Sequence, residues 1–116
     1  MRILNALCLS GVLLVAGCGP SPEVRAVESK AQSLVTRRAS AQEAVATFGR
    51  SPIHIVTRAE ALHYLDRTDP SDTVHKFWER VSQHPQAHYF PMPGGEILIF
   101  FDESGHAVGF YSNIQM

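Results

Sequence analysis

The sequence predicts an α+β protein, with N-terminal helices followed by a three-stranded antiparallel β-meander packed on a helix. Three observations support this fold class. Apolar residues recur every three to four positions up to Phe48, which is the spacing of an amphipathic helix. The same spacing returns between residues 74 and 81. After residue 86, short apolar runs alternate with glycine-containing turns, which is typical of strands joined as hairpins.

The first 17 residues have the composition of a secretory signal peptide. Arg2 is followed by an apolar run from Ile3 to Ala16. This run is shorter than the roughly 20 residues that a membrane-spanning helix needs. We therefore expect residues 1–17 to be removed during export.

The segment Val15-Ala16-Gly17-Cys18, directly behind the apolar run, resembles the lipobox of bacterial lipoproteins. The resemblance implies cleavage after Gly17, a diacylglyceryl group on the Cys18 thiol, and acylation of the new amino terminus by a chain such as palmitate. Several acyl chains give stable membrane anchoring. Gly19, in place of an aspartate, resembles lipoproteins sent to the outer membrane. The expected location is therefore the bacterial cell envelope, on the outer membrane and facing the periplasm.

The rest of the chain is large enough for one small domain. We divide it into the lipidated cysteine with its proline-stiffened tether (18–22), an amphipathic helical segment (23–49) and a small α+β domain (50–116). The formal net charge of the whole chain is −1, which gives no indication of nucleic-acid binding. Charge is uneven, because acidic residues outnumber basic ones after residue 58. With Cys8 removed and Cys18 lipidated, no thiol remains for a disulfide, a nucleophile or a metal site.

The helical segment shows a heptad-like pattern with a charged interruption at Arg38. Ser40 and Glu43 have the spacing of a capping box, and Gly49 is placed as a C-terminal cap. One long helix and two helices broken near Ala39–Ser40 both fit. The pattern also fits self-association through 23–48, or a helix that lies on its own domain or acts as a spacer. We favour the second of these two readings. The residues of the pattern are Val24, Val27, Ala31, Leu34, Arg38, Ala41, Val45 and Phe48.

Residues 53–56 predict a short strand, and Thr57 with Glu60 has the spacing of a second capping box, opening a helix to about Arg67. Asp69 is the expected N-cap of a further helix, with Pro70 at its first position. That helix has one clean apolar face and ends near His84. The residues of this face are Val74, Phe77, Trp78 and Val81.

The last third predicts three strands. Residues 87–90 form a strand that we expect at a sheet edge, because Pro91 and Pro93 lack amide donors. Residues 96–101 are apolar on both faces, which favours a central strand. A turn at Asp102–Gly105 leads to a partner strand from His106 to about Ile114.

Catalytic and metal-binding motifs are missing from the sequence. Its six histidines show no HExxH or comparable spacing, so we expect surface histidines, no metal and no cofactor. Asp102 and Glu103 are adjacent carboxylates, but a hairpin turn does not offer the cleft that raises a catalytic pKa. We therefore expect a protein that is not an enzyme.

The segment from Tyr89 to Gly95 is the most suggestive of binding. Aromatic residues, methionine and stiff prolines are typical of interface cores. Tyr89, Phe90 and Met92 are therefore the candidate partner-binding residues. The alternative is that Phe90 and Met92 are core residues of an edge strand whose prolines prevent aggregation.

The order helix–helix–meander, over roughly residues 57–114, resembles the SmpA/OmlA-type lipoproteins of outer-membrane barrel assembly. Where that family has Gly-Met-Thr, this chain has Val56-Thr57-Arg58, and Leu65 to Pro70 replaces the family's Leu-Gly-x-Pro turn. No functional residue is carried over. The combination of signal, lipobox, short tether and one small β-containing domain is also similar to periplasmic lipoproteins that neutralise a toxin or a lytic enzyme, such as immunity proteins and lysozyme inhibitors.

These features together predict a membrane-anchored, non-enzymatic protein-binding module. One form of this function is an inhibitor or immunity protein against a cell-wall hydrolase or toxin. The alternative is a structural accessory lipoprotein of outer-membrane assembly, or an envelope spacer that associates with itself.

Overall fold

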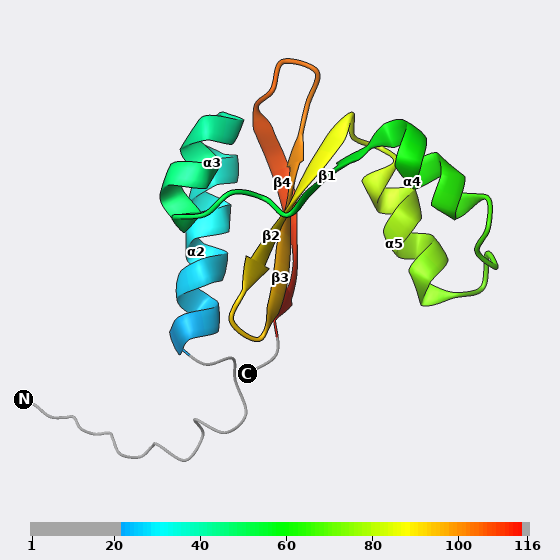
Figure 1. Ribbon diagram of the computed structural model, residues 1–116, viewed down its shortest axis with the longest axis horizontal. Helices are drawn as coiled ribbons and strands as arrows, with labels where there is room; N and C mark the ends of the chain where they lie inside the picture. The colour runs from blue at the N-terminus through cyan, green and yellow to red at the C-terminus, as the bar shows by residue number, and fades with distance from the viewer. Residues whose placement is uncertain (1–21, 115–116) are drawn as a thin grey trace, which may run out of the picture.

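The computed structural model describes residues 22–114 and confirms the α+β class. Cys18, Gly17 and most of the tether lie outside the described residues. The elements of the described part follow the order α2 (Pro22–Thr36), α3 (Ala41–Phe48), β1 (His54–Thr57), α4 (Arg58–Leu65), α5 (Thr73–Val81), β2 (Gln86–Met92), β3 (Gly95–Phe101) and β4 (Ala107–Ile114). All strands join one antiparallel sheet in the order β1-β2-β3-β4 (Figure 1).

The sheet has four strands, so the prediction of a three-stranded meander is wrong in its strand count. The meander of β2, β3 and β4 is present, and β1 adds to its free side, with His54 opposite Tyr89 and Thr57 opposite Gln86. The sequence predicts a strand at 53–56, but α4 and α5 separate it from β2. Its pairing is therefore a long-range contact that no local turn signal reveals.

β2 is an interior strand for part of its length, which corrects its expected place at the edge. β1 pairs only with residues 86–89. Pro91 lies beyond that stretch, where its missing amide interrupts no bond to β1. The Arg50 side chain donates to the Pro91 carbonyl at 2.8 Å, so this locally open edge is capped by a cation.

β3 is the central strand predicted from its sequence. It lies between β2 and β4, and every residue from Ile97 to Phe101 is buried. Because successive side chains of a strand point to opposite faces, this strand supplies two cores at once.

The two faces of the sheet are covered by different helix pairs (Figure 1). The core under α2 and α3, called here the closed face, consists of Ala31, Leu34, Ala39, Ala44, Phe90, Ile97, Ile99, Phe101 and Ala107. The core under α4 and α5, called here the open face, consists of Val56, Ala61, Val81, Ala87, Leu98 and Phe100.

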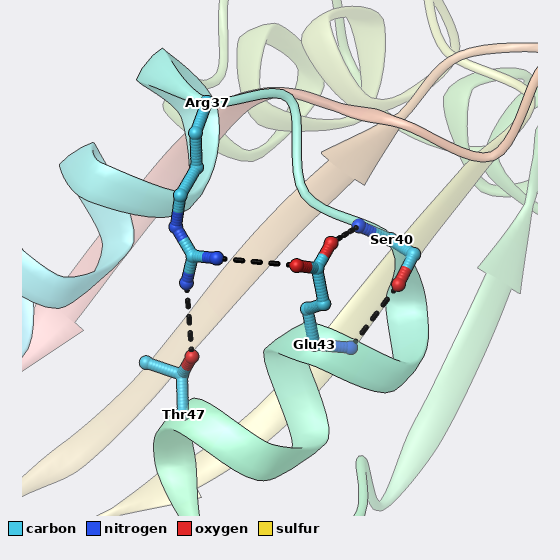
Figure 2. Close-up of polar contacts among 4 residues, drawn as sticks. All are labelled: Arg37, Ser40, Glu43 and Thr47. Carbon is cyan, nitrogen blue, oxygen red and sulfur yellow. Dashed lines mark hydrogen bonds and ion pairs between the residues drawn. The ribbon is translucent and has the colours of Figure 1, made fainter.

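The helical segment is two helices, with the break between Thr36 and Ala41. Arg38 adopts a left-handed conformation (φ 52°), and the Ala39 amide donates to the Leu34 carbonyl, which closes α2. Ser40 then caps α3. Its hydroxyl accepts from the Glu43 amide and the Glu43 carboxylate accepts from the Ser40 amide, forming the predicted capping box (Figure 2).

Arg37, the first residue after α2, extends this cap. Its guanidinium donates to the Glu43 carboxylate at 3.2 Å and to the Thr47 hydroxyl at 3.3 Å (Figure 2). The hydrogen bond that the Ser40 amide donates to the Glu43 carboxylate contributes most to holding the pKa of Glu43 below its usual value, and Arg37 adds to this effect. The C-terminal cap at Gly49 is also present, with φ 69°.

The start of α5 differs from prediction. Asp72, not Asp69, is the N-cap, and its side chain accepts from the Val74 amide. The Asp69 side chain instead accepts from the amide and hydroxyl of Ser71, which forms a local turn ahead of the helix. The helix therefore begins at Thr73, after this turn.

None of the helices among residues 22–114 has the length and apolar character that a membrane span requires.

Candidate partner-binding groove

The three predicted partner-binding residues do not form one surface. Phe90 is completely buried in the closed face, where its ring lies 5.0 Å from that of Phe48, and Met92 packs against the same core. Tyr89 is half-buried and points to the open face. The structure therefore separates Tyr89 from Phe90 and Met92, because neighbouring residues of a strand face opposite ways.

Tyr89 lines a groove between the open face of the sheet and the α4–α5 pair, called here the Tyr89 groove. Its floor is built from cross-strand neighbours, since Tyr89 lies opposite Leu98 and Leu98 lies opposite Tyr111. The next row on this face places Glu96 opposite Asn113. The floor is thus aromatic and apolar in one row and polar in the next.

The roof of the groove is the N-terminal half of α5. Val81, at the other end of this helix, is buried, but Val74 is 46% exposed. Figure 1 shows α5 diverging from the sheet toward its N-terminal end. The divergence leaves a hollow of about 300 Å³, the lower limit for small-ligand pockets. The hollow is lined by Thr73, Val74, Phe77, Tyr89, Glu96, Leu98, Tyr111 and Asn113.

A second hollow, of about 470 Å³, lies on the β1 side of Tyr89. Ile53 stands at its rim with 65% of its surface exposed, and Tyr64 is 41% exposed. The Tyr64 ring stacks on that of Trp78 at 4.6 Å, which holds α4 against α5. This hollow is lined by Ile53, His54, Val56, Glu60, Tyr64, Trp78 and Tyr89.

The Tyr89 phenol interacts directly with the Glu96 carboxylate. Burial contributes most to raising the pKa of Tyr89 to about 12, and a hydrogen bond to Glu96 and repulsion by its charge add to this. The phenol therefore keeps its proton at neutral pH. The Asn113 amide also donates to the Glu96 carboxylate, at 3.2 Å. Neither partner of Glu96 carries a compensating positive charge.

The second hollow has its own carboxylate, which is partnered differently. His54 Nε2 lies 2.8 Å from one Glu60 oxygen and 3.1 Å from the other. Thr57 accepts from the Glu60 amide as predicted, but the Glu60 carboxylate turns to His54 rather than back to the helix start. The reciprocal half of this capping box is therefore replaced by a hydrogen bond to His54 of β1.

The adjacent carboxylates Asp102 and Glu103 lie away from this groove. Asp102 accepts from the amides of His106 and Ser104. The His106 bond contributes most to lowering the pKa of Asp102, with the Ser104 bond and the Arg38 charge adding to it. Asp102 thus stabilises its own turn, and exposed Glu103 lies 3.8 Å from Arg58. Among residues 22–114 no three His, Cys, Asp or Glu side chains are grouped to hold a metal ion.

The apolar side of the helical segment faces the sheet of its own chain. Val24, Ala31 and Leu34 are buried, with Ala31 and Leu34 in the closed-face core. Val27, Val45 and Phe48 are partly buried and pack against the same core. The Tyr89 groove is the better candidate for contact with another molecule.

The sequence identified Tyr89 but missed the other groove residues. A period-two alternation in the 86–92 strand was the available signal, because it places Tyr89 and Phe90 on opposite faces. Glu96, Phe77 and Tyr111 join Tyr89 only through strand register and helix packing.

No protein-family model, curated protein or solved structure matches this chain.

Proposed function

We propose that this chain is a lipid-anchored, non-enzymatic protein-binding module of the bacterial envelope that docks its partner in the Tyr89 groove. The observation that supports this most strongly is the incomplete cover of the open face. Large apolar side chains remain exposed along the groove, whereas the large residues under α2 and α3 on the opposite face, such as Phe90 and Leu34, are fully buried. Aromatic and apolar groups next to a few oriented polar groups are what interface cores use. The exposed residues that line the groove are Ile53, Tyr64 and Val74.

The anchor of this proposal is Cys18, supported by the lipobox at Val15–Cys18. A Cys18→Ala protein is expected to leave the membrane fraction, because no acyl chain then holds it. Fractionation of cells that express either form tests this. Equal recovery of both forms in membranes would contradict lipid anchoring and leave the groove untouched as a hypothesis.

The docking surface is tested with a photo-crosslinking amino acid placed at Val74 in the full chain, in intact cells. Val74 is exposed at the mouth of the groove, so we expect one dominant protein adduct. The matched control places the same amino acid at Gln42, which is exposed on α3, on the other side of the sheet. Adducts of equal strength at both positions would argue against the groove.

The identity of the crosslinked protein distinguishes an inhibitor or immunity role from an accessory role in outer-membrane assembly. A secreted cell-wall hydrolase or toxin supports an inhibitor or immunity role, which an activity assay with the purified pair then tests. Subunits of an outer-membrane assembly machine support the accessory role.

A further inference from the structure

The hollow of the Tyr89 groove under α5 combines aromatic rings with a carboxylate. Phe77, Tyr89 and Tyr111 line it together with Glu96. Phe77 and Tyr111 meet edge to face with ring centroids 5.3 Å apart. Aromatic faces beside a carboxylate form a setting that attracts organic cations, through the ring quadrupole and through Coulomb attraction.

Glu96 has no counter-ion within the described part of the chain. Where described residues pair with one another, Arg37 pairs with Glu43, Arg38 with Asp102 and Arg58 with Glu103, and His54 lies beside Glu60. The described residues that line this hollow include no Lys, Arg or His. The half-buried Glu96 carboxylate is thus held by neutral donors only, and a cation from outside would complete its pairing.

The same face of the sheet already accommodates a guanidinium one step away. The Arg80 guanidinium carbon lies 5.1 Å from the Phe100 ring centroid and 6.0 Å from that of Tyr111, and the group donates to the Phe110 carbonyl at 2.9 Å. A planar guanidinium stacks on aromatic rings and pairs with a carboxylate through two parallel hydrogen bonds, which an ammonium cannot do.

We propose that this hollow is a receptor site for an arginine side chain of the protein partner. The guanidinium would pair with Glu96 and contact the rings of Tyr89 and Tyr111. The inference rests on the proposed function, since it names the chemistry of the partner at the groove. The excess of acidic residues after residue 58 is consistent with it, because it favours the approach of a basic surface.

The test uses the full lipidated chain in uncharged detergent micelles and three probes: the acetyl-amide derivatives of arginine, lysine and citrulline. Citrulline has the shape of arginine without its charge. Binding is followed by NMR through the ring signals of tyrosine. We expect the arginine derivative to bind with a dissociation constant on the order of millimolar, as suits a single side chain, and citrulline about tenfold more weakly.

Glu96→Gln removes the charge and keeps the shape, and is expected to weaken arginine binding about tenfold. Glu79→Gln is the matched control, because it makes the same charge change at an exposed position of α5 outside the hollow. Tyr111→Leu tests the ring contribution, with an expected loss of about threefold.

Equal binding of arginine and citrulline, or an unchanged affinity in Glu96→Gln, would overturn the proposal. Equal binding of the lysine derivative would overturn the choice of a guanidinium. These measurements need no partner, so their failure is distinguishable from failure of the docking surface in the crosslinking experiment.

Discussion

The two faces of the sheet are built from the same three strands of the meander, but the helices cover them to different extents. On the closed face, α2 and α3 bury large residues completely, including Phe90 and Leu34. On the open face, α5 is buried at Val81 and exposed at Val74. The helices therefore cover the closed face more completely, and the open face keeps a groove.

The largest expected effect is a difference in the free energy of unfolding between variants of two neighbouring residues on opposite faces. Phe90→Ala removes a fully buried ring from the closed face and should lower the free energy of unfolding by about 3–5 kcal/mol. Tyr89→Ala on the open face should cost only about 1–2 kcal/mol, because the ring is half exposed. Chemical denaturation of the full chain in micelles measures both.

Because Phe90→Ala can leave little stability, Phe90→Leu serves as a milder second variant, with an expected cost of about 1 kcal/mol. Equal destabilisation by Tyr89→Ala and Phe90→Ala would contradict this difference between the two faces.

A smaller effect concerns pH. His88 lies on the closed face with its ring 4.4 Å from that of Phe101, and burial lowers its pKa below the ordinary 6.5. The folded protein therefore binds a proton at His88 less readily than the unfolded chain does. Stability is expected to fall as the pH drops below about 6.5.

His88→Leu should make this fall shallower between about pH 5 and 7, a window above the titration of the carboxylates. Some slope should remain, because burial is the main cause that lowers the pKa of His84 on the open face, with Arg80 and Arg58 contributing. His63→Gln is a control at an exposed histidine. If stability depends on pH equally steeply in His88→Leu and in the wild type, protonation of His88 does not contribute to that dependence.

Local signals allowed much of the fold to be predicted. The Ser40 capping box, the left-handed Gly49 and the two-faced apolar run of β3 each depend on residues close in sequence, and all are present. The strand at 53–56 was predicted, but its place in the sheet was not, because β1 reaches β2 across two intervening helices.

The candidate site was harder to predict for the same physical reason. Tyr89, Leu98 and Tyr111 meet through the register of three strands. The groove itself depends on how α5 lies against the sheet, buried at Val81 and exposed at Val74, which no local motif specifies.

If Cys18 is lipidated, the start of α2 at Pro22 limits how far the Tyr89 groove can lie from the membrane surface. In Figure 1 the first turn of α2 and the β2–β3 turn lie at the same end of the molecule, and Glu96 is the second residue of β3. With lipid on Cys18, the chain from Cys18 to Pro22 spans at most ~14 Å. The hollow of the Tyr89 groove under α5 would then lie close to the lipid headgroups. A partner confined to the same membrane would search for it in two dimensions, at a raised effective concentration, and would gain occupancy without any additional contact.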